Sequence, residues 1–475
     1  AFARRGARPH LLSTIGPMRL YDTFTRSLVE LPPPPGPVGI YWCGPTVYQR
    51  IHVGNAFAVT ILPLWLKRWL DSRGYETKLV VNITDINDKI YDAAPGASAQ
   101  LAADATRWYV EDTDRLGLGR PDVEPTAVET VADQIAMIEE LVERGFAYES
   151  DGDVYFRVSR YPEYGRLSGQ RPDHVEEQEP NPRKEDPRDF ALWKANKPGE
   201  DTWWESPWGR GRPGWHIECS VMSEKHLGPE FEIHGGGLDL VFPHHENEIA
   251  QSRALGRRFA RIWMHNGMLR FAGEEMHKSV GNDVSLKDAL DTWGRQTLLV
   301  FFLTGHWRKP LDYTDATLTA AAAQVESFRN AFASDRVVRP SDDAAEWNRF
   351  SAALDDDFNT SAALAIMHGW LSSGYLDLLA RGLSTFGLSF ERAKISHVTQ
   401  QVPAGGAVAE GVAPREIRVA TIGSPSEEIL SLAHRRFDLR TAGDYAAADQ
   451  VRDELAAEGW NVRDEADGFV LEPSK

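Results

Sequence analysis

One short segment near the N-terminus constrains the fold of this chain more than any other part. Val38–Cys43 is an apolar run that predicts a buried strand, and the apolar stretch after His52 predicts a helix that continues to Leu70. Gly74 ends this helix, and Lys78–Thr84 predicts the next strand. A strand, a Gly-containing loop, a helix and a second strand form a βαβ unit, which favours a parallel sheet. We therefore expect an α/β domain that binds its ligands at the carboxyl ends of the strands.

The composition is that of a globular protein. At 475 residues the chain is long enough for about three domains. The content of 42% hydrophobic and 26% charged residues is ordinary, and no apolar run reaches the roughly 18 residues of a membrane span. The two cysteines, Cys43 and Cys219, exclude a disulfide scaffold and favour a reducing, cytoplasmic setting. The net charge of −18 disfavours broad contact with nucleic acid, although basic patches can be local.

Changes in composition divide the chain into five segments. We expect an N-terminal extension at 1–17, an α/β domain at 18–315, a helical domain at 316–395, a linker at 396–425 and a C-terminal domain at 426–475. The extension lacks acidic residues, which fits a targeting peptide or a start placed upstream of Met18, and we favour the second. An inserted segment is expected at about 120–205, where the charged run 176–188 predicts an exposed loop. The linker is rich in Gly, Ala and Val at 402–411, and two amphipathic helices are predicted within 427–458.

A nucleotide site in this chain must use residues outside a Walker motif, because no Gly-x-x-x-x-Gly-Lys-Ser/Thr run is present. His52, Gly54 and Asn55 stand where the predicted helix begins. The free N–H groups of a helix N-terminus bind phosphates, Gly54 permits close approach of a nucleotide, and His52 and Asn55 can donate hydrogen bonds. The alternative is that His52 is an ordinary surface residue.

A second candidate lies far downstream, at Glu275–Ser279 between Gly273 and Gly281. A lysine on a loop bordered by glycines, here Lys278, is typical of a lid that neutralises phosphate charge in a transition state. The alternative is a solvated surface lysine.

A third candidate is a metal site. His244 and Glu248 are four residues apart, so on a helix they project from one face, as paired zinc ligands do. Cys43 and Cys219 complete a set of normal zinc ligands. Spacing alone leaves the choice open, since further candidates lie in the same segments, and both thiols could be core residues. Those further candidates are His216, His245 and Glu246.

Taken together and in order, these motifs resemble the class I aminoacyl-tRNA synthetases, and within them the bacterial cysteinyl-tRNA synthetases. The resemblance runs from about Met18 to the C-terminus. It is carried by Cys43–Tyr48, His52–Asn55, Asn82–Lys89, Gly214–Ser220, His234–Leu240, Phe242–Glu248 and Trp263–Gly267, with Leu354–Thr360 in the helical domain and Ala446–Leu455 in the C-terminal domain.

The resemblance implies a fold and a set of site residues. The fold is a Rossmann-like parallel-sheet catalytic domain with an insertion, followed by a helical bundle domain and a small C-terminal anticodon-binding domain. His52–Asn55 corresponds to the HIGH motif and Glu275–Ser279 to the KMSKS loop, which makes His52, Asn55 and Lys278 catalytic. The implied ATP-binding residues are His52, Gly54, Asn55, Gly236, Asp239 and Lys278; the cysteine pocket is Thr84, Trp215 and His216; the ligands of one Zn²⁺ are Cys43, Cys219, His244 and Glu248.

The implied activity is acyl transfer in two steps, from L-cysteine and ATP to cysteinyl-adenylate and then to tRNA(Cys), with release of AMP and diphosphate. Mg²⁺ is expected with ATP, and the enzyme is expected to be a monomer without a membrane partner. Three departures reduce positive charge near ATP: Glu275 replaces the first lysine of the KMSKS loop, His277 replaces its middle serine, and Phe57 and Ala58 follow the HIGH motif where an Arg-bearing segment is common.

Two alternative functions remain open from the sequence. One is a ligase that joins activated cysteine to an amino-sugar, which would not need the long C-terminal part. The other is a non-catalytic paralogue that binds tRNA. Four arginines could form a local basic patch in the C-terminal helices, or could instead pair with Asp438, Asp444 and Asp449. These arginines are Arg435, Arg436, Arg440 and Arg452.

Overall fold

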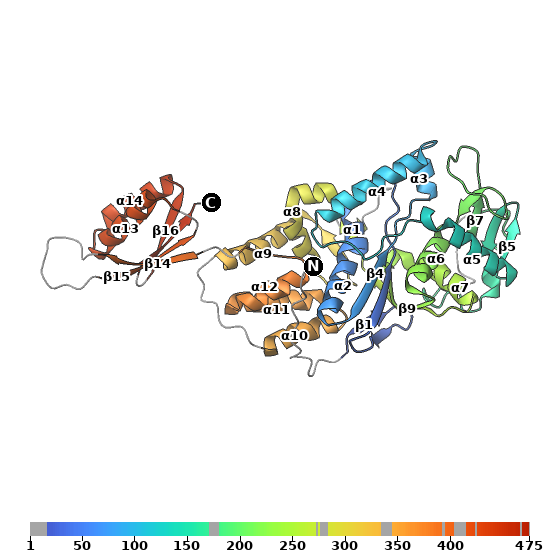
Figure 1. Ribbon diagram of the computed structural model, residues 1–475, viewed down its shortest axis with the longest axis horizontal. Helices are drawn as coiled ribbons and strands as arrows, with labels where there is room; N and C mark the ends of the chain where they lie inside the picture. Colours follow the sequence, from blue (N-terminus) through green and yellow to red (C-terminus); the bar gives the residue numbers. More distant parts are fainter. Residues whose placement is uncertain are drawn as a thin grey trace, which may run out of the picture. The chain divides into compact units, whose positions relative to one another are not determined.

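The computed structural model divides into two compact units (Figure 1). The first comprises residues 1–325 and 340–389, and the second comprises 326–339 and 390–475. The residues that the structure describes are 17–170, 180–271, 274–275, 284–333, 344–391, 395–402, 415–422, 425–465 and 468–474.

A four-stranded parallel sheet forms the centre of the first unit, as the βαβ pattern predicted. Its order is β10-β9-β3-β4, and every neighbouring pair is parallel. The strands are β3 (Pro37–Trp42), β4 (Glu76–Val81), β9 (Glu230–Gly237) and β10 (Phe259–Asn266). Ile40, Tyr41 and Trp42 are completely buried because helices or loops cover both faces of such a sheet.

The connection between β3 and β4 is helical throughout. α1 (Val53–Ala56), a π-helical turn (Phe57–Ile61) and α2 (Leu62–Ser72) follow one another without a break. The chain turns at Gly74, whose φ of +88° suits a residue without a Cβ. The predicted helix is therefore confirmed, with a π-helical turn that its periodicity did not reveal.

The segment inserted before β9 builds its own antiparallel sheet of order β5-β6-β7-β8. Its elements are α5 (Val131–Glu143), β5 (Ala147–Ser150), β6 (Asp153–Phe156), β7 (Phe190–Ala195) and β8 (Gly211–Pro213). This sheet continues past the predicted end at about 205, because Gly211–Pro213 pairs with Trp193–Ala195. α6 (Trp215–Leu227) then leads back to β9.

Several further elements surround the central sheet. They are β1 (Arg19–Asp22), β2 (Ser27–Glu30), α3 (Asp88–Ala93), α4 (Ser98–Asp114), η6 (Val241–His245), α7 (Glu246–Ala254), β11 (Leu269–Phe271), β12 (Glu274–Glu275), α8 (Leu286–Leu303) and β13 (Leu311–Tyr313). α7 begins directly after η6, so His244 and Glu248 stand on one continuous helical stretch.

Helices follow the part that contains the parallel sheet, as predicted. They are α9 (Asp315–Ala333), α10 (Ala344–Asp355), α11 (Thr360–Ser373) and α12 (Leu376–Thr385). Asp355 of α10 accepts hydrogen bonds from Trp69 Nε1 at 3.1 Å and Arg73 Nη2 at 2.9 Å, which attaches this helix to α2. Among the described residues, none of the helices is both long and apolar enough to cross a membrane.

The second unit corrects the predicted linker at 396–425. β14 (Ile395–Val402) and β15 (Arg415–Ile422) occupy much of that range and pair with β17 (Gly468–Pro473) and β16 (Trp460–Glu465) in a sheet of order β14-β15-β17-β16. The linker prediction was wrong for these segments because their pairing partners lie up to 50 residues away, as for Arg418 of β15 and Gly468 of β17. α13 (Glu427–Thr441) and α14 (Tyr445–Ala457) pack their apolar residues on this sheet.

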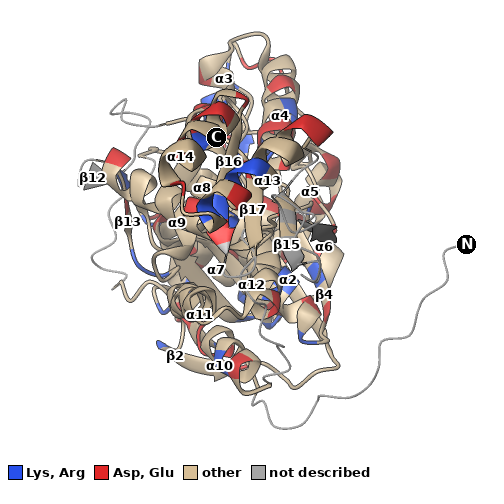
Figure 2. Ribbon diagram, turned by 90° about the vertical axis from the view of Figure 1, so that its left-hand side faces the viewer, with Lys and Arg blue, Asp and Glu red and all other residues tan. Residues whose placement is uncertain are grey.

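The arginines of these helices do not form the single basic patch that the sequence allowed. Arg436 is buried and donates to both carboxylate oxygens of Asp464, at 2.6 and 3.0 Å. Arg440 pairs with the same carboxylate at 3.2 Å, and Arg452 pairs with Asp449 at 3.0 Å. Figure 2 shows basic and acidic positions mixed on α13 and α14.

A buried guanidinium attaches the inserted sheet to the central domain. Arg212 of β8 has a side chain only 3% exposed and pairs with Asp88 of α3 and with Glu200, the latter at 3.1 Å. Its guanidinium also lies 4.9 Å from the ring of Tyr91. Lys194 of β7 binds the other oxygen of Asp88 at 2.9 Å. These contacts fix the strand that leads into Trp215.

Replacement of Arg212 by Met should therefore destabilise the protein. Loss of one member of a buried ion pair costs about 3–5 kcal/mol, and because the Asp88 side chain is 45% exposed we expect about 3 kcal/mol. Urea unfolding followed by circular dichroism measures this. Lys197→Met, at an exposed position of the same insertion, is the control. An unchanged midpoint for Arg212→Met would show that the pair does not stabilise the fold.

Candidate active site

Four metal-binding side chains meet beyond the carboxyl end of β3. Cys43 directly follows β3, Cys219 projects from α6, and His244 and Glu248 come from the η6–α7 stretch. All four are buried, and their donor atoms lie within 4.8 Å of one another. The predicted set is thus assembled from segments more than 200 residues apart.

The distances within this set fit one tetrahedral zinc ion. Two sulfur atoms that each lie about 2.3 Å from a tetrahedral zinc are about 3.8 Å apart. Cys43 Sγ and Cys219 Sγ are 3.7 Å apart. For sulfur and oxygen ligands the same geometry gives about 3.5 Å, and for nitrogen and oxygen about 3.3 Å. The observed values are 3.7 Å for Cys43 Sγ and Glu248 Oε1, and 3.1 Å for His244 Nε2 and Glu248 Oε1.

A second possible ligand set shares Cys43 and Glu248 but uses His234 and His245. His234 Nε2 lies 2.8 Å from Glu248 Oε2, which is a hydrogen-bond distance and is too short for two ligands of one tetrahedral ion. His245 Nε2 lies 3.3 Å from Cys43 Sγ, and its Nδ1 lies 2.7 Å from His265 Nε2. We interpret His234 and His245 as hydrogen-bond partners of two ligands.

The tautomers of His245 and His265 follow from the contact that His265 makes with Thr23. The hydroxyl of Thr23 lies 2.8 Å from His265 Nδ1. If that hydroxyl donates, His265 donates from Nε2 to His245 Nδ1, and His245 donates from Nε2 to the sulfur of Cys43. Such donors orient a metal ligand and are the usual surroundings of a metal site. The sequence motifs contained His234 and His265, but nothing in their spacing indicated this role.

Burial sets the protonation states of the cluster. Desolvation lowers the pKa of His216, His234 and His265 to about 3 and that of His244 and His245 well below the usual value. Desolvation also raises the pKa of Glu248 and Cys43 well above their usual values. Neutral imidazoles present the lone pairs that metals require, and a divalent cation would favour the thiolate and carboxylate forms.

Two of the residues predicted to line the cysteine pocket contact the metal cluster directly. The indole of Trp215 stacks on the ring of His244, with centroids 4.2 Å apart. His216 Nδ1 lies 3.0 Å from His244 Nδ1, so His244 presents Nε2 to the other ligands. Both residues begin α6, one turn before Cys219.

Thr84, the third predicted pocket residue, lies on the β4 side of the same cluster. Its hydroxyl accepts a hydrogen bond from Asn82 Nδ2 at 3.1 Å, and Asn82 Oδ1 accepts from the backbone N–H of Gly44 at 2.9 Å. Cys219 Sγ lies 3.7 Å from the same Asn82 oxygen. Asn82 therefore connects Thr84 with both cysteine-bearing segments.

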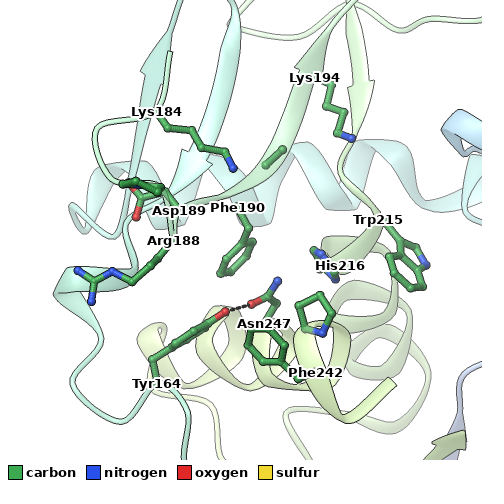
Figure 3. Close-up of a pocket in the computed structure, with 13 residues that line it drawn as sticks. Tyr164, Lys184, Arg188, Asp189, Phe190, Lys194, Trp215, His216, Phe242 and Asn247 are labelled. Atoms are coloured by element: carbon green, nitrogen blue, oxygen red, sulfur yellow. Dashed lines mark hydrogen bonds between the residues drawn. The ribbon is translucent and has the colours of Figure 1, made fainter. Parts of the chain in front are cut away.

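A pocket opens on the outer side of Trp215 and His216 (Figure 3). Its opposite wall is formed by the inserted segment, including Phe190 and Lys184. Its base contains Asn247, whose side-chain oxygen accepts a hydrogen bond from the hydroxyl of Tyr164 at 2.6 Å. The sequence did not indicate Tyr164 or Phe190, which lie outside the motifs, and it gave Asn247 only as a member of the Phe242–Glu248 motif without a role.

The predicted phosphate-binding turn stands at the start of α1. His52 is the N-cap, and its Nδ1 accepts from the backbone N–H of Asn55 at 3.2 Å, so the proton of the neutral ring is on Nε2. A Cβ on Gly54 would lie 3.2 Å from the His52 ring and from Leu269 Cβ. A side chain here would therefore crowd its neighbours, so packing favours glycine in addition to any ligand.

Lys278 lies outside the described residues, but both flanks of its loop are placed. Glu275 ends β12, which pairs with β11 through Arg270. On the other side the backbone oxygen of Val284 accepts from Val53 N at 2.8 Å, and Leu286 N donates to Ile51 O at 2.8 Å. The segment that follows the loop is thus hydrogen-bonded to the His52 turn.

Gly236 and Asp239 lie at and beyond the end of β9. A Cβ on Gly236 would lie 2.9 Å from Leu240 Cδ1 and 3.0 Å from His245 Cε1, so the tight packing explains this glycine without a ligand. Asp239 is exposed, as an adenosine-binding carboxylate would be. Their predicted contact with adenosine stays a prediction.

Comparison with known proteins identifies families that match along the chain. Residues 32–323 match the family "tRNA synthetases class I (C) catalytic domain", and residues 349–372 match the "DALR domain". A Cysteine--tRNA ligase of Streptococcus pneumoniae serotype 4 is 40% identical, over 95% of this chain and 98% of the relative. One from Halorhodospira halophila is 42% identical over the same shares.

A solved structure agrees in fold at low identity. Mycobacterium tuberculosis methionyl-tRNA synthetase, in complex with methionyl-adenylate, superimposes with a TM-score of 0.53 at 15% identity, covering 74% of this chain and 82% of that one. Its likeness concerns the fold alone.

Zinc content can distinguish the two ligand sets, because each contains residues absent from the other. Cys219→Ser and His244→Gln should abolish zinc binding, since a hydroxyl or amide is a much poorer ligand than thiolate or imidazole. His234→Gln and His245→Gln should retain a full zinc equivalent and bind it about ten-fold less tightly. Elemental analysis of the purified variants measures occupancy. Full zinc in Cys219→Ser, or none in His245→Gln, would reverse the assignment.

Proposed function

We propose that this chain, which belongs to the cysteine–tRNA ligases of the class I aminoacyl-tRNA synthetases, activates L-cysteine with ATP. It then transfers the activated cysteine to tRNA(Cys). The products besides cysteinyl-tRNA are AMP and diphosphate. The observation that carries the proposal is the buried group of Cys43, Cys219, His244 and Glu248, with Trp215 stacked against it at the end of the parallel sheet.

The first step needs stabilisation of charge on phosphate. The carboxylate of cysteine attacks the α-phosphorus of ATP, diphosphate leaves, and negative charge accumulates on the phosphate oxygens. His52 offers an Nε2–H at the start of α1, where free backbone N–H groups also favour anions. Asn55 and Lys278 are assigned to the same phosphates, and Mg²⁺ is expected to accompany ATP.

The second step transfers the acyl group. A terminal ribose hydroxyl of tRNA, expected to be the 2′-hydroxyl, attacks the carbonyl of the adenylate and AMP leaves. Neither step requires a covalent intermediate with the protein, so positioning and charge stabilisation supply the catalysis. We also expect a monomer that works in the cytoplasm.

The ligand set suggests how cysteine is distinguished from serine. A zinc ion held by Cys43, Cys219, His244 and Glu248 would supply preference for a thiolate over a hydroxyl ligand. Glu248 offers Oε1 to the cluster while His234 holds Oε2, so this carboxylate is expected to be the ligand that yields when a substrate sulfur enters. Thr84, Trp215 and His216 would then enclose the remainder of the amino acid.

Two activity measurements should test this function. Cysteine-dependent exchange of diphosphate with ATP and charging of a tRNA(Cys) transcript are both expected, and a chelator that removes zinc should suppress both. Serine should be discriminated by more than the roughly 10²-fold that pocket shape alone supplies. Exchange without charging, together with ligation to an amino-sugar, would support the sugar ligase. Absence of both activities in zinc-loaded protein would support a non-catalytic tRNA-binding role.

Lys278→Ala should slow adenylate formation by about 10²–10³-fold while leaving cysteine binding nearly unchanged, since the lysine acts on charge in the transition state. Glu275→Lys, which restores the family's charge, should strengthen the interaction with ATP. Lys287→Ala is the control, because this lysine pairs with Asp291 on α8. Rapid-quench experiments measure the rate of adenylate formation in each variant. Unchanged rates in both loop variants would show that the loop has no catalytic role.

A further inference from the structure

The hydroxyl of Tyr41 is buried beside the metal cluster without a hydrogen-bond partner. Tyr41 is on β3, two residues before Cys43, so both side chains lie on the same face of the sheet. The residue is completely buried, and its Oη makes no hydrogen bond of normal geometry in the part of the chain that the structure describes. Buried hydroxyls nearly always have a partner, so this one calls for an explanation such as a missing ion or a changed protonation state nearby.

The neighbours of Tyr41 restrict what that partner can be. Tyr41, Cys43 and Cys219 belong to one packed cluster, together with apolar residues of α6 and β10. The ring of His234 meets Tyr41 at its edge, with centroids 5.1 Å apart, and its Nδ1 also has no hydrogen-bond partner among the described residues. Desolvation raises the pKa of the Tyr41 phenol well above its usual value, and the nearby Cys219, Cys43 and Glu248 raise it further, Cys219 also through contact with the hydroxyl.

Cys43 and Cys219 differ in the groups that can donate to them. Cys43 Sγ has His245 Nε2 at 3.3 Å, a donor in the tautomer described above. Cys219 Sγ has the carboxamide oxygen of Asn82 at 3.7 Å, which can only accept. As a thiol, Cys219 can donate to that oxygen. As a thiolate it cannot, and it then needs a donor of its own.

We propose that Tyr41 is a positioning residue that donates its hydroxyl hydrogen to Sγ of Cys219 when this sulfur binds the metal as a thiolate. Each thiolate of the site then has one donor, His245 for Cys43 and Tyr41 for Cys219. A phenol with an ordinary pKa of about 10 keeps its proton at neutral pH and can serve as this donor. The inference rests on the proposed metal site. Hydrogen bonds to metal-bound sulfur weaken its donation to the metal and hold the ligand in place.

Tyr41→Phe tests this inference, because it removes one oxygen and keeps the ring. In cobalt-substituted protein the sulfur-to-metal charge-transfer band should move to lower energy, since a thiolate without its hydrogen bond donates more readily. The equilibrium constant for transfer of zinc from the protein to a competing chelator should be about ten-fold larger. Without metal, the variant should unfold at the same temperature as the parent or higher, because the oxygen it lacks had no partner.

Tyr161→Phe is the matched control. Tyr161 is also buried, its hydroxyl also makes no hydrogen bond of normal geometry among the described residues, and it belongs to a different hydrophobic cluster from Cys43 and Cys219. Its cobalt spectrum and zinc retention should equal those of the parent. An unshifted band and unchanged zinc retention in Tyr41→Phe would overturn the inference while leaving the metal site intact. Absence of zinc from the parent protein would instead refute the metal site itself.

Discussion

Exclusion of water from the end of β3 is the condition on which the rest of this site depends. Cys43, Cys219, His244 and Glu248 are all buried, and burial disfavours every charged form that these groups can adopt. Without a cation, burial of these neutral polar groups is unfavourable in free energy. With one, the desolvation that penalised the charges strengthens their attraction to the metal. The core around the cluster, including Trp263 and Phe231, is therefore part of the site.

Hydrogen bonds hold the side chains of this cluster in a defined geometry. Glu248 has one oxygen held by His234, and Cys43 faces the chain of His245 and His265. The inserted segment adds a further restraint, because Glu246 accepts from the backbone N–H groups of Gly165 and Ser168, both at 2.9 Å. Glu246 was a candidate ligand by spacing, and the structure gives it this structural role instead.

Long-range pairing explains where prediction from the sequence failed. Residues 396–402 were predicted as part of the linker, and only the antiparallel pairing of β14 with β15 shows that they form a strand. The arginines of α13 and α14 show the same limit. Helical spacing indicated that they could share a face, while Asp464, whose carboxylate neutralises two of them, is on β16 and outside any helical pattern.

The sequence by itself determined the parallel α/β fold of the catalytic part, since the βαβ pattern of residues 38–84 depends on local periodicity and turn residues. It also determined the candidate ligands, because thiols and the His244–Glu248 spacing are chemically distinctive. Tertiary structure alone decided how each histidine is placed within the candidate metal cluster. His234, His244 and His245 are equivalent as residue types, and only the distances to Glu248 and Cys43 separate a ligand from a hydrogen-bond partner. The physical reason is that coordination and hydrogen bonding differ by less than an ångström in atomic separation, a difference that packing sets and residue spacing does not encode.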